Sequence, residues 1–414
     1  MDHHPAPLAG FLALLIVSAG ACDAKQAPTP ESDREETRQA SRKTDEPASK
    51  PDREPLAGVP DGLRSDVRQH FVDMSQAGFE DTQQRLDHLT EMAQFLADEP
   101  SADALDSARR AWLDAHRAWI STEVYLYADH PARSKGLADR IDTWPIRPSH
   151  VDYIPGEPEA GLINQSDTEL DEDTLLEFHQ KGGEDYATTG FHVVELLLWG
   201  WSGGNTEERR YASAFGGDRQ TAPNPDRRRQ YLQAAVELLA DQHEQLLEMW
   251  SPESEEDSRS DFLERTDAEA IGEMLASMRR VCVEQLAGKR LRGPLEDDDL
   301  LALPSPFSRT GLTDIRASLG SLRHFYIGVD ARSDNSRLEG PGLQKVVAAA
   351  APELDKRLRD QLDGAIELVE EIPQPYDEAL KSDAGRPKIR EAADQLETIG
   401  ETLDQIAEKL GTPI

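Results

Sequence analysis

A regular spacing of apolar residues is the feature that most constrains the fold of this chain. Near the C-terminus, aliphatic residues recur alternately three and four positions apart; they are Ile389, Ala392, Leu396, Ile399, Leu403, Ile406 and Leu410. This spacing places all of them on one face of an α-helix that packs against other helices. Similar series run from Leu343 to Val369 and from Leu312 to Tyr326. No segment shows strand alternation with hairpin turns, so the sequence predicts an all-α protein.

Helix boundary signals agree with this fold class. Thr266 followed by Glu269 is typical of a capping box, and Asn224 before Pro225 is typical of a helix start. The predicted helices are 62–97, 101–128, 169–180, 184–200, 225–250, 266–288, 310–328, 341–371 and 384–411. They suffice for two packed, four-helix-type bundles, which we place at 61–250 and 262–414. The acidic segment 251–261 would separate them.

The first 21 residues are predicted to be a lipoprotein-type signal peptide. The apolar run at 8–21 is too short to span a bilayer comfortably, and it is followed by Cys22. The residues from Ala19 to Cys22 resemble the bacterial lipobox, in which the cysteine is lipidated and begins the mature chain. We therefore expect export and a lipid anchor at Cys22. Ordinary signal-peptidase cleavage without lipidation is the alternative.

Residues 22–60 are predicted to be a disordered, acidic and proline-rich tether. The only large aliphatic residues among them are Leu56 and Val59, and six prolines interrupt any helix. Such a composition buries too little apolar surface to offset the entropy of the chain.

The charge of the chain limits its partners. It has 45 Lys and Arg against 80 Asp and Glu, which gives a formal net charge of −35. Such a surface repels phosphate groups, so nucleic acid is not expected as a partner, and it favours cations or basic partners. The only cysteines are Cys22 and Cys282, and two cysteines are too few for a disulfide scaffold or a cysteine-rich zinc site.

The segment 190–200 carries the most suggestive chemistry. His192 and Glu195 stand three residues apart, so both project from one helix face and could hold one metal ion. Their neighbours are apolar nearly all round, so the helix is expected to be buried, and a buried His and Glu need partners. They form either a structural polar cluster or half of a metal site completed from another helix.

Two further pairs have the same spacing. His70 with Asp73 and His88 with Glu91 lie in polar sequence. We expect both pairs at the surface.

At Gly190, His192 and Glu195 the sequence resembles the imelysin family, whose signature is GxHxxE. The resemblance covers most of residues 70–414. Other similar segments are 108–125, with Trp112, Arg117 and Glu123 at the family's characteristic positions, 140–146 with its Trp-Pro pair, 227–250, 305–328 and 410–414. The resemblance implies a two-bundle fold in the bacterial envelope, often lipid-anchored, with a proposed metal site around His192 and Glu195. Members are associated with iron acquisition, and the founding members were described as metallopeptidases.

The residues help to weigh these two functions. A zinc peptidase needs three protein ligands, an open position and a general base. Leu196 follows Glu195, so this turn carries no second histidine, and the sequence offers no clear base. An iron site of one imidazole and several carboxylates needs neither a second histidine nor a general base.

On this resemblance and on ligand chemistry, Glu123 is the first choice as an additional ligand and Asp142 the second. Each would instead form a salt bridge in the alternative interpretation, with Arg117 as an obvious partner for Glu123. Gly190, Arg117 and Trp112 are expected to support the site.

The sequence thus predicts an envelope lipoprotein that faces the periplasm and binds a metal, iron in the first place and zinc as an alternative, in iron uptake or handling. Its partners would be the metal ion, a membrane reached through Cys22, and other iron-uptake proteins of the envelope. A metallopeptidase is the first alternative. A protein-interaction module with a structural HxxE cluster is the second.

Overall fold

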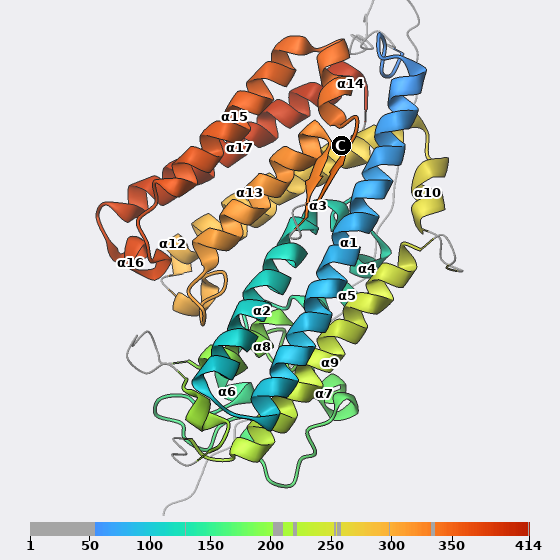
Figure 1. The fold of residues 1–414 in the computed structure, drawn as a ribbon. Coiled ribbons are helices and arrows are strands. Elements are labelled where there is room, and N and C mark those ends of the chain that lie inside the picture. Colours follow the sequence, from blue (N-terminus) through green and yellow to red (C-terminus); the bar gives the residue numbers. More distant parts are fainter. Residues whose placement is uncertain are drawn as a thin grey trace, which may run out of the picture. The chain divides into compact units, whose positions relative to one another are not determined.

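Helices make up almost all the regular structure of the described residues, and the all-α prediction is confirmed (Figure 1). The computed structural model describes residues 54–128, 130–201, 210–217, 222–251, 254, 258–297, 299–332, 336–412 and 414. The predicted signal peptide, Cys22 and most of the predicted tether lie outside these residues. The described residues form one compact unit.

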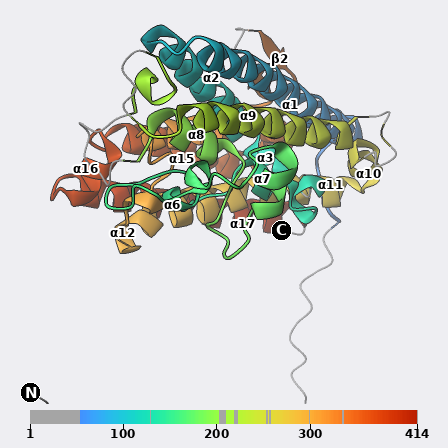
Figure 2. The same ribbon diagram turned by 90° about the horizontal axis from the view of Figure 1, so that it is seen from below.

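The first group of helices comes from the N-terminal half of this unit. Its long members are α1 (Asp61–Asp98), α2 (Ala102–Ser121), α8 (Phe191–Trp199) and α9 (Pro225–Met249). Both α2 and α9 pack along α1, and α8 contacts α2 and α9 (Figure 2). The shorter elements are α3 (Glu123–Leu126), α4 (Pro131–Ser134), α5 (Leu137–Ile141), α6 (Pro148–Val151), α7 (Glu172–Phe178) and the 3-10 turns η1 (Leu162–Asn164) and η2 (Ala212–Ala214).

The second group comes from the C-terminal half. Its long members are α11 (Asp267–Arg279), which continues into the π-helix η3 (Arg280–Arg292), α13 (Gly311–Ile327), α15 (Pro352–Glu370) and α17 (Gly385–Leu410). The shorter helices are α10 (Ser258–Glu264), α12 (Gly293–Asp297), η4 (Leu300–Ala302), α14 (Leu343–Ala350) and α16 (Tyr376–Lys381). The two groups meet where α13 packs on α2 and where α3 packs on α11 and α13.

The apolar series of the sequence form the core of the second group. Every residue of the series from Ile389 to Leu410 is buried in α17. Helix α17 packs on η3 and α15, as its single apolar face predicts. No helix in the described ranges is long and apolar enough to cross a membrane.

Two long predicted helices are interrupted. The helix predicted over 101–128 breaks at Thr122, whose hydroxyl donates a hydrogen bond of 2.7 Å to the carbonyl of Trp119. The helix predicted over 341–371 breaks at Ala351, because the residue before a proline is driven out of the helical conformation. A small antiparallel hairpin, β1 (Val329–Ala331) with β2 (Arg337–Glu339), was not predicted.

The end of the predicted tether belongs to the folded unit. Leu56 and Val59 are buried, and the backbone N–H of Leu56 donates to the carbonyl of Leu410 at 2.7 Å. This hydrogen bond joins the segment to the end of α17. The tether prediction is therefore wrong for residues 54–60.

The two other His/acid pairs differ from each other. His88 is exposed and lies 3.6 Å from Glu91, as expected of a surface pair. His70, in contrast, is buried, and its Nε2 lies 2.9 Å from the carbonyl oxygen of Gly328. The surface prediction for His70 is wrong, because α1 is covered by the turn between α13 and β1.

Candidate metal centre

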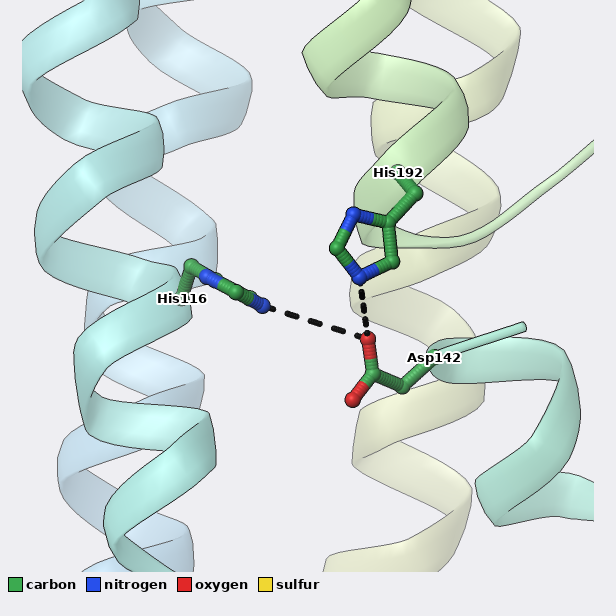
Figure 3. A group of neighbouring side chains, drawn as sticks. All are labelled: His116, Asp142 and His192. Atoms are coloured by element: carbon green, nitrogen blue, oxygen red, sulfur yellow. Dashed lines mark ion pairs between the residues drawn. The ribbon is translucent and has the colours of Figure 1, made fainter. Parts of the chain in front are cut away.

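Three side chains from separate segments converge beside α8 (Figure 3). They are His116 of α2, Asp142 just after α5, and His192 of α8, and one ligand atom from each lies within 4.8 Å of the others. His192 Nε2 is 3.2 Å and His116 Nε2 is 3.9 Å from the same atom, Asp142 Oδ1. Two imidazole nitrogens and one carboxylate oxygen therefore point at a common place.

His116 is held in this position by Trp112, one helical turn earlier. The two rings are stacked, with centroids 4.6 Å apart and an interplanar angle of 23°. The indole N–H of Trp112 also donates a 2.9 Å hydrogen bond to the carbonyl of Phe191, which precedes His192. Trp112 thus fixes both histidines relative to each other.

Gly190 allows α8 to begin close to the end of α5. Its φ is +100°, and a Cβ there would lie 2.6 Å from the carbonyl oxygen of Arg140 and 2.8 Å from that of Ile141. Any larger residue would push α8 away from α5. The glycine of the GxHxxE pattern therefore brings His192 next to Asp142.

Glu195 lies behind His192. Its Oε2 is 2.9 Å from His192 Nδ1, the ring nitrogen that faces away from Asp142. Its Oε1 accepts hydrogen bonds from the backbone N–H groups of Phe307 and Ser308, at 3.1 and 2.6 Å. Glu195 is fully buried, and both of its oxygens are occupied by protein groups.

Asp314 of α13 faces His116 in a similar way. Asp314 Oδ1 is 3.7 Å from His116 Nδ1, again the nitrogen that faces away from Asp142. Each histidine thus directs Nε2 inward and Nδ1 toward a carboxylate. Histidines that bind metals in proteins commonly have this arrangement, since the outer carboxylate fixes the ring and its tautomer.

Asp142 keeps one oxygen available. The indole N–H of Trp119 donates to Asp142 Oδ2 at 2.9 Å. Among the described residues, Asp142 Oδ1 has no hydrogen-bond partner although it is buried, and the same holds for His116 Nδ1 and Asp314 Oδ2. Buried polar atoms without partners are costly, so Asp142 Oδ1 is an oxygen prepared to accept a ligand.

The charges of the centre favour a cation. Burial disfavours the charged form of His116, but Asp314 and Asp142 outweigh it and raise the pKa of His116 to about 10. Asp142 and Glu195 likewise outweigh burial and raise the pKa of His192. Burial raises the pKa of Asp142, but the two neighbouring histidines outweigh it and hold this pKa well below its usual range. The carboxylates thus attract positive charge to the space between the three groups.

Glu123 lies near this group but is tied to another residue. Arg290 of η3 donates to both of its oxygens, at 2.8 Å from Nη1 to Oε2, and Ser318 donates to Oε2 at 3.1 Å. The partner of Glu123 is thus Arg290 and not Arg117. The side chain of Arg117 is exposed and lies 4.0 Å from Asp114, away from the centre.

Two residues of the centre were missed from the sequence. His116 is a single histidine on the otherwise apolar face of α2, and Asp314 belongs to α13, almost 200 residues later. The one signal was the position of His116 between Trp112 and Trp119 in the sequence. Of the predicted residues, the structure brings His192 and Asp142 together and places Glu195 behind His192.

The centre opens into a cavity of about 960 Å³. His116, Asp142, His192, Asp314 and Glu123 line it, and Glu195 does not. The remaining wall comes from both helix groups, including η3 and the Trp144-Pro145 segment.

The donor set fits a transition metal. Two imidazoles and one carboxylate are typical of mononuclear iron sites that keep open positions, and they also suit zinc. Glu195 and Asp314 supply the outer carboxylates that such ligands need.

Comparison with known proteins identifies the relatives of the chain. The sequence profile of the imelysin family matches residues 75–403. A protein named iron-regulated protein A, from Synechococcus elongatus, is 24% identical over 306 residues, which cover 74% of this chain and 75% of that protein.

Two solved structures share the fold. One is described as a putative iron-regulated protein A precursor from Parabacteroides distasonis, with a TM-score of 0.63 and 18% identity, and the match covers 86% of this chain and 100% of the other. The second is an imelysin-like protein from Psychrobacter arcticum, with a TM-score of 0.63 and 17% identity, and the match covers 86% of this chain and 98% of the other.

Proposed function

The chain belongs to the imelysin family, and on that premise we propose that it binds an iron ion through His116, Asp142 and His192 and serves in iron handling. The observation that carries the proposal is the convergence of three donor atoms within 4.8 Å, with Asp142 Oδ1 facing both imidazoles and accepting no hydrogen bond among the described residues. Iron is favoured by the donor set and by the relative named iron-regulated protein A. Zinc, which accepts the same ligands, is the alternative metal.

Each residue has a separate task in this proposal. His116 and His192 offer Nε2, and Asp142 offers Oδ1. Glu195 and Asp314 hold the Nδ1 atoms and so keep the Nε2 atoms directed inward. Because a ligating imidazole must be neutral, His116 and His192 give up protons when the ion binds, and their raised pKa values make binding weaker in acid.

The proposal is tested by metal content and affinity. We expect the purified full chain to hold one equivalent of iron by elemental analysis. His116→Ala should lose the metal and retain the helical circular dichroism of the wild type. His88→Ala removes an exposed histidine and is the matched control, which should bind as the wild type does. If the wild type binds no transition metal and His116→Ala unfolds, the centre is a structural polar cluster, as in an interaction module.

We also propose that the protein acts in the bacterial envelope. The support lies in the sequence: an apolar run at 8–21 that ends at a lipobox-like segment before Cys22. A lipid at Cys22 would keep the metal-binding unit beside the membrane and near other iron-uptake proteins. Incorporation of a labelled fatty acid in cells tests this, because Cys22→Ser should lose the label. An equally labelled variant would refute the anchor.

A metallopeptidase is the second candidate function, and the free oxygen of Asp314 is what favours it. A metallopeptidase needs open metal positions and a carboxylate that accepts the proton of the attacking water. Asp314 lines the cavity, and its Oδ2 is unpaired among the described residues. In this case the wild type should cleave denatured casein in a chelator-sensitive way, and Asp314→Asn should bind metal without cleaving. A metal-loaded wild type that cleaves nothing rules the peptidase out.

A further inference from the structure

We propose that the metal is bound together with a small organic chelator with oxygen donors, which stays in the cavity beside the metal. This inference rests on the proposed function, since it names the form in which the same centre takes its cargo.

The protein supplies only part of an iron coordination sphere. Three donor atoms surround the common place, from His116, Asp142 and His192. Sites of two histidines and one carboxylate leave further iron positions open for exogenous ligands. The nearby carboxylates do not fill them, because Glu195 lies behind His192 and Glu123 is bound by Arg290.

The cavity is larger than water ligands require. Water molecules that completed the coordination would need about 30 Å³ each, on the order of 100 Å³ in all. The cavity next to the centre has about 960 Å³. That volume lies in the range of pockets for organic ligands of several hundred daltons. A bare ion would leave most of it to solvent.

The cavity wall also carries positive groups. Lys289 and Arg133 line the cavity, and neither would help to bind a bare cation. Lys289 is exposed and forms no ion pair within the described ranges, and the Arg133 guanidinium lies 4.1 Å over the ring of Tyr127. Both cations can reach anionic oxygens of a bound chelator, and Trp144 and Tyr127 provide flat apolar surface for its carbon atoms.

Carboxylates of the same cavity would give selectivity for a loaded chelator. The wall carries Asp139, Glu184 and Glu284, besides Asp142 and Asp314 of the centre. These carboxylates repel a free anionic chelator, and a chelator whose charge is offset by its metal is repelled much less. The cavity should therefore distinguish a loaded chelator from an empty one.

The test uses the full chain and two ferric probes, ferric citrate and ferric acetohydroxamate. Iron and the organic ligand carry different radioactive labels, and equilibrium dialysis measures how much of each is retained. We expect at least one probe to be retained with iron and organic ligand in a fixed ratio. The same organic ligand without iron should bind at least about tenfold more weakly. His192→Ala should lose both labels.

A charge variant tests the cavity itself. In the double variant Lys289→Ala/Arg133→Ala, affinity for the retained chelate should fall about tenfold, which corresponds to about 1.4 kcal/mol. Binding of cobalt(II) alone should not change, because the three metal ligands are intact. Lys345→Ala removes an exposed lysine of α14 outside the cavity and is the matched control.

Two outcomes would overturn the chelate proposal, and they differ in what they mean for metal binding. If iron is retained and both organic ligands are released, the centre takes the bare ion, and metal binding stands. If neither ferric probe nor cobalt(II) binds to the wild type, the proposed function falls as well.

Discussion

At the scale of single residues, the two histidines of the centre have matching surroundings. Each directs Nε2 to Asp142 Oδ1 and Nδ1 to a carboxylate, Glu195 for His192 and Asp314 for His116. An i, i+3 spacing only places His192 and Glu195 on one face. It cannot tell whether both bind a metal or one holds the other, and the structure indicates the second arrangement.

Glu195 therefore acts through His192. We predict that Glu195→Gln weakens metal binding about 10- to 100-fold without abolishing it, as removal of outer carboxylates typically does. Calorimetric titration with cobalt(II) measures the affinity. Glu91→Gln changes an exposed glutamate three residues after His88 and should have no effect. A complete loss of binding in Glu195→Gln, equal to that in His192→Ala, would make Glu195 a ligand.

His192 and Asp142 were within reach of sequence reasoning, whereas His116 was not. His192 lies in an apolar helix and within a recognisable pattern, and Asp142 lies near the Trp-Pro pair. A lone histidine such as His116 on an apolar helix face is usually a core residue. Its function follows only from the packing of α2 against α8, which no local pattern encodes.

At the scale of elements, the position of α8 against α5 decides the geometry of the centre. Gly190 permits this contact because it has no Cβ and adopts a positive φ. The helices themselves were predictable from apolar periodicity. The break at Thr122 was not, because no glycine or proline marks it in the sequence.

We predict that Gly190→Ala lowers the free energy of unfolding by roughly 1–3 kcal/mol through backbone strain alone. The clash of the new Cβ with two carbonyl oxygens adds to this loss. Urea unfolding followed by circular dichroism gives the free energy. Gly364→Ala in α15 is the control, since a Cβ there would meet nothing within 4 Å; it should stabilise by up to about 1 kcal/mol. Equal free energies for the two variants would refute the close-contact role of Gly190.

The Glu123–Arg290 ion pair joins α3 to η3, and hence the two helix groups. Arg290→Met leaves the carboxylate of Glu123 buried without its partner and should cost about 3–5 kcal/mol in urea unfolding. Glu123→Gln/Arg290→Met should recover much of that loss, since no unpaired charge remains. If Arg290→Met is as stable as the wild type, the pair does not hold the groups together.

At the scale of the whole molecule, the apolar series predicted two groups of helices. They could not predict which faces meet, because every series is compatible with many partners. The hairpin of β1 and β2 was missed because its two strands have only three residues each. The short helices α4, α5 and α6 depend on tertiary packing and were therefore not predictable. They position Asp142 at the centre.

Two buried histidines outside the centre should limit stability in acid. Burial lowers the pKa of both His130 and His243 to about 3, with His130 adding to the effect on His243. The unfolded chain takes up these protons below a pH of about 6.5, and the folded chain does so only near 3. Stability is thus full at neutral pH and falls as the pH drops from about 6.5 toward 3, by on the order of 3–5 kcal/mol per histidine.

Urea unfolding at pH 7.5, 5.5 and 4.5 measures this slope. In the wild type, His130 Nδ1 accepts a hydrogen bond from the Ala132 N–H at 3.1 Å. The variant His130→Asn places an amide oxygen near this position, and the asparagine side chain is not protonated in this pH range. We expect a smaller loss of stability in acid for this variant. An unchanged slope would contradict the assignment.

The most direct test of the metal centre is an anomalous-scattering map from crystals of the iron-loaded protein. We expect one strong peak at the cavity wall, within bonding distance of His116 Nε2, His192 Nε2 and Asp142 Oδ1, with Glu195 outside the coordination sphere. A peak ligated by Glu195 or Glu123, or iron bound only elsewhere, would contradict this assignment.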